Sequence, residues 1–239
     1  MAFNTKLPIV TDGLILSVDP YNRKSYVSGG TTCVDITKNK YPGTLVNGVT
    51  YNNSWVFDGS NQEITINSGF GVNPPSLPIT IDFWIYIPNS ASNGGWVALD
   101  TNSTNYYGVN IQGSGTNQAS LGFGDGTGFG TADRKSIVTV GTVPTDEWVH
   151  ITAVYRSPVG NDMTCYVNKV DVGGTPTGGS LMTNPVWSSD SAARTRLGDS
   201  WGLGNFYGEI SISQVNVYNR ELTTDEIKQN DNALKYRFI

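Results

Sequence analysis

Short runs of β-branched and aromatic residues, each closed by turn residues, recur along the whole chain and limit most strongly what it can fold into. The clearest runs, each of which predicts a strand, are residues 14–18, 55–57, 63–66, 79–87, 148–155, 163–167 and 210–217. Turn pairs such as Asn47-Gly48 and Asp58-Gly59 separate them, and in these Gly and Asn adopt a positive φ at little cost. The pattern predicts an all-β fold with many hairpins.

Alternation within the strands indicates how they pack. In residues 63–66 and 79–87, apolar residues alternate with others, so one face of each strand packs inward and the other is partly solvated. Two stacked antiparallel sheets satisfy this pattern. Sandwiches of about 200 to 250 residues form one domain, and no repeat or linker divides the 239 residues. We therefore expect residues 1–239 to be a single domain.

One helix is expected, at the C-terminal end. Thr223 and Glu226 have the spacing of a capping box, in which each side chain bonds to the backbone N–H of the other residue. Leu222 before the cap and Ile227 after it form the matching hydrophobic staple. The sequence predicts a short helix that starts near Thr224 and runs toward Leu234.

Segments spread over nearly the whole chain resemble, in order, the laminin G-like family of the concanavalin A-like lectin and glucanase superfamily. They are residues 11–19, 43–48, 56–59, 81–85, 147–155, 165–168, 197–198, 207–210 and 217–227. The resemblance implies a two-sheet antiparallel jelly-roll sandwich. One departure concerns the acidic pair that the family often carries after the glycine of its last strand: here Ser211 and Ser213 stand nearby.

The two ends of the chain are similar in style to lectin-like domains of tailed-phage virion proteins. The segments concerned are residues 29–32, 43–48, 227–230 and 233–238. This similarity implies a capsid decoration, tail or fibre component, which is assembled in the host cytoplasm and has other virion proteins or its own copies as partners. The first residues lack the charged start and apolar stretch of a secretory signal.

Charge and hydropathy argue against two classes of partner. The formal net charge is −5, and no run of Lys or Arg could follow a phosphate backbone, so nucleic acid is not expected as a partner. No apolar window of about 18 residues occurs, so membrane insertion is not expected either.

The residues of common catalytic sites are mostly missing. The tight acidic motif by which glucanases of the superfamily present two carboxylates is absent. His150, the one histidine, lies inside a strand run and is interpreted as structural. Cys33 and Cys165 are interpreted as buried thiols rather than a pair. We predict that the protein is not an enzyme; a glycosidase with atypical carboxylates is the weaker alternative.

Calcium is the one cofactor that stays open, because it needs only oxygen ligands. Asp58 and Asp100 are the candidate ligands in turn-rich segments, although no EF-hand spacing is present. Loop Asp residues also form turns without any metal. A single histidine with two distant cysteines falls short of a zinc site.

Sugar binding needs an aromatic face for the ring C–H groups and polar neighbours for the hydroxyls. The candidate ligand-binding residues are Trp187, Trp201, Asp199 and Tyr107, which lie in polar, Gly-, Ser- or Asn-rich surroundings. For Trp187 and Trp201, packing of the loops is an equal alternative. Trp84 and Trp148 are expected to lie in the core, and for Trp96 packing is favoured over a surface contact.

Two functions follow as hypotheses. The first is a non-enzymatic structural or recognition protein of a phage virion, built on a lectin-like sandwich. The second is a carbohydrate-binding adhesin or free lectin.

Overall fold

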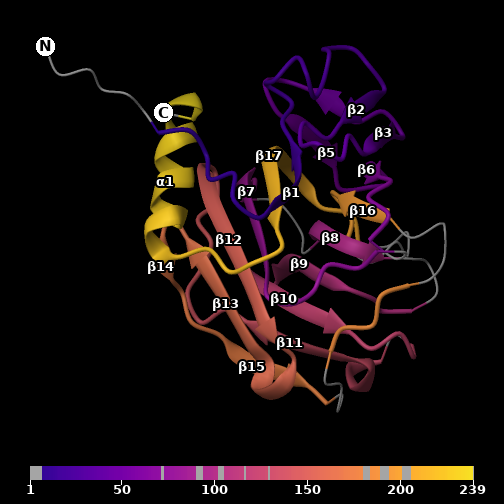
Figure 1. The fold of residues 1–239 in the computed structure, drawn as a ribbon, viewed down its shortest axis with the longest axis vertical. Helices are drawn as coiled ribbons and strands as arrows, with labels where there is room; N and C mark the ends of the chain where they lie inside the picture. Colours follow the sequence, from indigo (N-terminus) through magenta and orange to yellow (C-terminus); the bar gives the residue numbers. More distant parts are fainter. Residues whose placement is uncertain are drawn as a thin grey trace, which may run out of the picture.

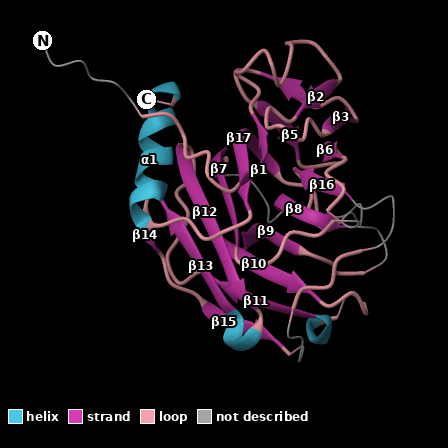
Figure 2. Cartoon of the chain, viewed as in Figure 1, coloured by secondary structure: helices cyan, strands magenta, loops and turns pink. Residues whose placement is uncertain are grey.

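A computed structural model describes residues 7–70, 73–89, 94–101, 105–115, 117–128, 130–179, 184–188, 194–200 and 206–238. Two antiparallel sheets pack face to face, and an α-helix lies against the outside of one of them (Figures 1 and 2). The predicted all-β sandwich with a short C-terminal helix is therefore confirmed. No helix in the described part of the chain is long and apolar enough to cross a membrane.

Sheet A carries the helix. Its strands follow the order β14, β13, β12, β7, β17, β5 and β4, and β1 also pairs with β17. Their bounds are β1 Leu14–Val18, β4 Thr50–Tyr51, β5 Trp55–Asp58, β7 Ile79–Tyr86, β12 Trp148–Ser157, β13 Asp162–Val167, β14 Val170–Asp171 and β17 Glu209–Tyr218.

Sheet B follows the order β15, β11, β10, β9, β8, β16, β6, β3 and β2. Its bounds are β2 Thr32–Val34, β3 Pro42–Val46, β6 Glu63–Ile66, β8 Gly95–Thr101, β9 Val109–Ser114, β10 Gln118–Gly124, β11 Arg134–Val138, β15 Thr175–Gly178 and β16 Arg194–Leu197. The α-helix α1 spans Thr224–Leu234, and short 3₁₀ turns span Thr131–Asp133, Val159–Asn161 and Lys235–Arg237. Each strand predicted from the sequence is present, with ends that agree within about two residues.

The core lies between the inner faces of the two sheets. Residues paired across neighbouring strands share a face, and one such row on sheet B is wholly apolar and buried. The row consists of Ile137, Leu121, Ile111, Val97, Leu197, Ile64 and Leu45. On sheet A, Ala153, Ile81 and Val217 form a matching row. Burial of these side chains is the main favourable term in folding.

Cys33 and Cys165 are both buried and free, as the sequence predicts. Burial raises the pKa of each thiol to about 12. A thiol with so high a pKa holds its proton at neutral pH and is a poor nucleophile.

The outer face of sheet A is polar beneath α1 and centres on the buried carboxylate of Asp82. Its Oδ2 accepts a hydrogen bond from Thr152 Oγ1 at 2.8 Å and lies 3.0 Å from His150 Nε2. Its Oδ1 accepts from Asn230 Nδ2 of α1 at 3.2 Å and from Asn216 Nδ2 at 3.5 Å. A single carboxylate therefore connects β7, β12, β17 and α1. His150 is fully buried here, which agrees with its predicted structural role.

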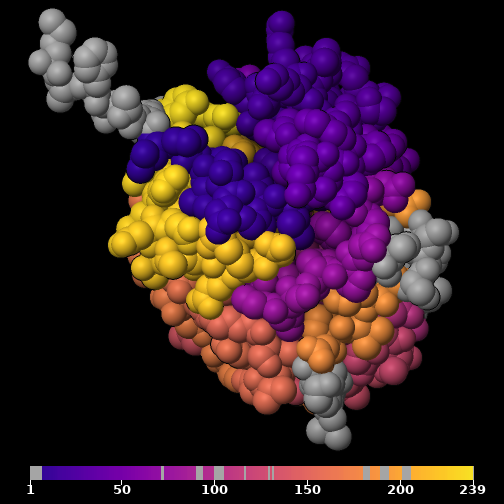
Figure 3. Space-filling model, viewed as in Figure 1, coloured from indigo at the N-terminus to yellow at the C-terminus, as the bar shows by residue number. Residues whose placement is uncertain are grey.

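A second buried acid, Asp231 of α1, lies on the other side of the His150 ring. Asp231 Oδ1 lies 3.9 Å from His150 Nδ1, and Asp231 Oδ2 accepts from Lys169 Nζ at 2.6 Å. The helix also holds the N-terminal segment: Gln229 Nε2 donates to the Pro8 carbonyl at 2.7 Å. In Figure 3 the yellow C-terminal atoms accordingly border the indigo N-terminal ones.

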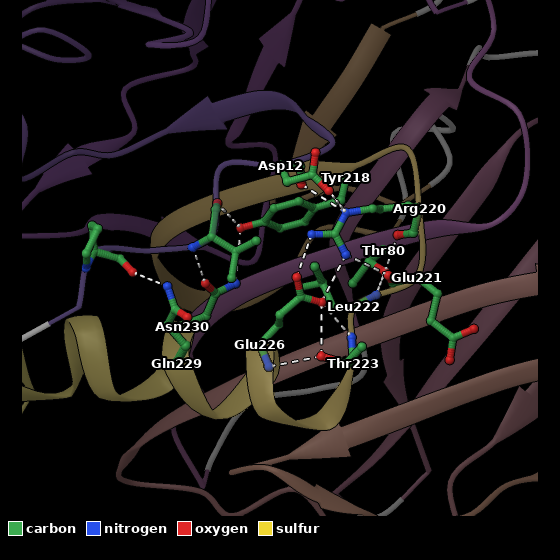
Figure 4. A network of polar contacts seen from close by, with 12 residues as sticks. Asp12, Thr80, Tyr218, Arg220, Glu221, Leu222, Thr223, Glu226, Gln229 and Asn230 are labelled. Carbon is green, nitrogen blue, oxygen red and sulfur yellow. Dashed lines mark hydrogen bonds and ion pairs between the residues drawn. The ribbon is translucent and has the colours of Figure 1, made fainter.

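The first turn of α1 contains the predicted capping box (Figure 4). The Glu226 N–H donates to Thr223 Oγ1 at 3.3 Å, and the Thr223 N–H donates to Glu226 Oε2 at 2.9 Å. Arg220 donates hydrogen bonds to the same carboxylate from both terminal nitrogens, at 2.9 and 2.7 Å. The Arg220 hydrogen bonds, followed by those from Thr223, hold the pKa of Glu226 near 2 against an ordinary value of 4.5.

The tail after α1 covers two tryptophans that the sequence placed in the interior. Phe238 stacks on Trp84 with ring centroids 4.5 Å apart and packs on Trp148 at 4.6 Å. Trp84 is buried beneath the tail rather than in the cluster between the sheets, and Trp148 is only half-buried. Trp96, by contrast, lies between the sheets against Phe83, as predicted.

Replacement of Asp82 by alanine should lower the free energy of unfolding by about 3–5 kcal/mol, because it leaves buried polar partners without their acceptor. Denaturant unfolding followed by tryptophan fluorescence measures the change. Asp225→Ala is the control, since that side chain is 89% exposed and its ion pair with Lys228 lies on the surface. Equal losses in the two variants would contradict a central role for Asp82.

Glu226 should stabilise the fold in a pH-dependent way. Its pKa is depressed in the folded state, so its contribution is complete above about pH 4.5 and is lost as the pH falls toward about 2. The difference in unfolding free energy between wild type and Glu226→Gln should therefore be largest above pH 4.5 and vanish near pH 2. Asp225→Asn, in the same turn, is the matched control. A difference that stays constant across this range would disprove the assignment.

Candidate functional site

The outer face of sheet B carries a continuous row of small and polar residues. Because paired residues share a face, the strand register places one row across the whole sheet. It consists of Thr177, Ser136, Gly122, Asn110, Ala98, Arg196, Thr65, Thr44 and Thr32. No large apolar side chain occurs in this row, in contrast to the inner row one residue along each strand. The face is therefore suited to polar recognition.

Part of this face is covered and part is open. Ser200 Oγ donates to Gln112 Oε1 at 2.8 Å, and the backbone at Asp199 and Ser200 lies so close to β8 that a Cβ on Gly95 would be 2.0 Å from Ser200 N. Over β8 to β11 the row is buried, as Asn110 shows with 1% exposure. Over β6, β3 and β2 it is half-buried or exposed.

Arg196 of β16 lies between the covered part of the row, which begins at β8, and the open part, which begins at β6. Several polar groups surround it. Its Nη1 forms a very short ion pair with Glu63 Oε2 and lies 3.9 Å from Asp199 Oδ2. The Nε of Arg196 is buried and has no hydrogen-bond partner among the described residues. We call Glu63, Arg196, Asp199 and Tyr207 the Arg196 cluster.

Tyr207 completes the Arg196 cluster. It forms a bridge with Asp199 through the backbone, and its side chain is half-buried. Burial raises the pKa of its phenol, the Glu63 and Asp199 carboxylates raise it further, and Arg196 lowers it. The phenol therefore stays protonated at neutral pH and can donate a hydrogen bond next to the acids.

The structure brings only some of the predicted ligand-binding residues together. Tyr107 and Val186 both contact Gly126, so Tyr107 and the neighbouring Trp187 lie at the same end of sheet B. Ser200, the neighbour of Asp199, bonds instead to Gln112 of β9, whereas Val186, the neighbour of Trp187, bonds to Gly108. The Asp199 side chain is fully buried and faces Arg196, so it does not lie on the surface.

Trp187 is half-buried and packs against the main core, so of the two interpretations the packing one describes its contacts here. Tyr107 is likewise half-buried. Trp201 lies outside the described residues, as does the side chain of Asp100.

The candidate calcium ligand Asp58 is exposed, and its Oδ1 accepts the Ser60 N–H at 2.9 Å, which is the contact of a turn-forming Asp. Among the described residues, no group of three or more His, Cys, Asp or Glu side chains could hold a metal ion.

Sequence reasoning missed Glu63, Arg196 and Tyr207. A partial signal existed for Glu63, because the alternation of residues 63–66 places Glu63 and Thr65 on the polar face of that strand. The pairing of β6 with β16 that sets Arg196 beside it cannot be deduced from either segment alone.

Residues 58–228 match the model of the Laminin_G_3 family, described as the concanavalin A-like lectin/glucanases superfamily. The chain belongs to this family. The expected laminin G-like resemblance is thereby confirmed over most of the sequence. No curated protein matches the chain.

Several solved structures are similar in fold at low sequence identity. A Trypanosoma rangeli sialidase in complex with sialic acid matches 95% of this chain and 34% of its own length, with 14% identity and a TM-score of 0.62. Domain 4 of AbnA, an extracellular arabinanase from Geobacillus stearothermophilus in complex with arabinotriose, matches 92% of this chain and 98% of its own, with 17% identity and a TM-score of 0.61.

The receptor binding domain of botulinum neurotoxin type G matches 95% of this chain and 51% of its own, with 15% identity and a TM-score of 0.62. This laminin G-like chain thus spans about a third of the sialidase and about half of the neurotoxin domain. At such identities the likeness concerns the fold.

Proposed function

We propose that the chain is a non-enzymatic recognition module that binds a glycan at the Arg196 cluster, on the outer face of sheet B. The observation that carries the proposal is a guanidinium, a carboxylate and a phenol held together at the edge of an open polar surface. Sugar recognition needs donors and acceptors in fixed positions, and an aromatic side chain for the ring C–H groups. Arg196, Glu63 and Tyr207 supply these groups.

Binding suits these residues better than glycoside hydrolysis. A hydrolase needs one carboxyl that keeps its proton at neutral pH to protonate the leaving oxygen. Here Glu63 forms an ion pair with the Arg196 guanidinium, and Asp199 Oδ2 lies 3.9 Å from the same nitrogen, so both acids are engaged by one cation. Glu63 can accept hydrogen bonds from sugar hydroxyls, whereas the buried Asp199 helps to hold Arg196 in place.

The fold comparisons support a glycan as the class of ligand. The arabinanase domain, which corresponds in length to this chain, is described in complex with arabinotriose, and the sialidase in complex with sialic acid. A sandwich of this kind is a rigid platform, so its ligand contacts need little reorganisation on binding.

A glycan array that includes arabinan oligosaccharides and sialylated glycans tests the proposal. Wild type should bind at least one glycan class, and Arg196→Lys should lower the affinity about tenfold or more, because lysine keeps the charge but loses the planar fork. Thr177→Ala is the matched control: Thr177 belongs to the same row, is exposed, and lies on the far edge strand β15. Circular dichroism checks that both variants fold. Absence of binding to every glycan would refute the proposal.

We further propose that this module works in a tailed-phage particle, as a capsid decoration, tail or fibre component that contacts other virion proteins or its own copies and is assembled in the host cytoplasm. Support comes from the resemblance of its two end segments to such domains. The arrangement of the two sheets agrees with this role, since α1 covers part of the outer face of sheet A, while the outer face of sheet B is open over β6, β3 and β2.

The particle role predicts a high copy number in purified virions, measured by proteomics, or a symmetric oligomer in solution, measured by light scattering. A monomer that is absent from particles would contradict it and would favour the free lectin or adhesin. The glycan array tests glycan binding independently of the particle role, so either of these two proposals can fail without the other.

A further inference from the structure

A concave site that shares no residue with the Arg196 cluster is built mainly by the loop between β1 and β2. It is a pocket of about 520 Å³, within the size range of small-ligand sites. Tyr21, Tyr26 and Tyr51 line it together with Arg23, Val27 and Ser28. In Figures 1 and 3 the indigo segment that forms most of it lies at the upper end of the molecule.

The aromatic lining is held in place by packing beneath it. The Tyr26 ring lies 5.2 Å from the Tyr51 ring and 5.9 Å from the buried Trp55 ring. Its hydroxyl donates to the Gly30 carbonyl at 3.2 Å. Tyr26 is only 4% exposed, whereas Tyr21 is 54% exposed and presents its ring to solvent. The pocket therefore combines a fixed floor with an accessible aromatic side.

The loop itself is fastened at its start by Asp19. The Asp19 carboxylate accepts the Tyr21 N–H at 2.9 Å and pairs with Arg237 at 3.0 Å. The Arg237 guanidinium also lies over the Tyr21 ring, 5.0 Å from its centroid. Asp19 and Arg237 form an ion pair with each other. Arg23 is therefore the charged side chain that lines the pocket and can pair with a ligand.

Arg23 is exposed and makes no ion pair or hydrogen bond with any residue in the described ranges. The segment that carries Arg23 has exposed charges of one sign. Between residues 20 and 51 the exposed ionised side chains are Arg23, Lys24, Lys38 and Lys40, and the only acid, Asp35, is fully buried. In a chain whose net charge is −5, this segment is a local positive region that attracts an anion.

We propose that this pocket binds an acidic sugar, that is, a sugar ring carrying a carboxylate. The ring packs its C–H groups against the exposed tyrosine face, and the carboxylate pairs with the Arg23 guanidinium, whose planar fork matches it. Ser28 and the tyrosine hydroxyls offer hydrogen bonds to the sugar hydroxyls. This site is separate from the Arg196 cluster and does not depend on the function proposed there.

Titration of the ¹⁵N-labelled protein, followed by NMR chemical shifts, tests the proposal with three probes. Methyl β-glucuronide and methyl α-sialoside represent the two sources of an acidic sugar, and methyl β-glucoside is the neutral match of the first. At least one acidic probe should shift the signals of residues 20–30 and bind about tenfold more tightly than the glucoside. Equal affinity for the neutral probe, or no binding of either acidic probe, would overturn the proposal.

Two neighbouring cations give a matched pair of variants. Arg23→Gln should lower the affinity for the acidic probe about tenfold or more, since it removes a charge-assisted bond. Lys24→Gln removes the same charge from an exposed neighbour outside the pocket lining and should lower it no more than about twofold. Equal losses would mean a diffuse electrostatic effect and would also overturn the proposal. Arg196→Lys should leave this binding unchanged, which separates the failure of one site from failure of the other.

Discussion

The arrangement of the whole sandwich depends on one buried carboxylate on the outside of sheet A. Asp82 would be costly to bury alone, and it is acceptable because Thr152, Asn216 and Asn230 all donate to it. Asn230 comes from α1, so the polar face of sheet A is satisfied only when the helix is docked. The helix in turn holds the N-terminal segment and places Arg237 on Asp19. Docking of α1 therefore links both ends of the chain to the sheet.

Because α1 covers part of the outer face of sheet A, recognition is assigned to sheet B and to the loops. At the centre of sheet A, in β7, both faces are buried, the inner one by the core and the outer one by α1 and the tail. Sheet B has the same apolar inner face, but its outer row is small and polar and is only partly covered. Thr44 is exposed and Thr65 and Arg196 are half-buried on this face, so contacts there need not disturb the core. The same sandwich can then vary its contacts while its interior stays unchanged.

Local signals in the sequence predicted the local structure well. Strand runs such as residues 63–66 depend on alternation, and the first turn of α1 depends on Thr223 and Glu226 alone, so both could be identified without the fold. Trp84 shows the limit: both faces of its strand are buried, so alternation cannot say which face it joins. The partnership of Arg196 with Glu63 spans 133 residues and depends on the order of strands in sheet B, which no local pattern encodes.

The same limit explains why exposed aromatic residues in polar surroundings were an incomplete guide to the site. Trp187 sits in such surroundings and yet packs on the core, because a loop that closes the end of a sandwich needs a large side chain there. The aromatic residues with accessible polar neighbours are instead tyrosines, Tyr207 beside Arg196 and Tyr21 near Arg23. In both places an arginine accompanies the tyrosine. The two sites differ in what positions them: Glu63 and Arg196 lie on the strands β6 and β16, whereas Tyr21 and Arg23 lie on the loop between β1 and β2.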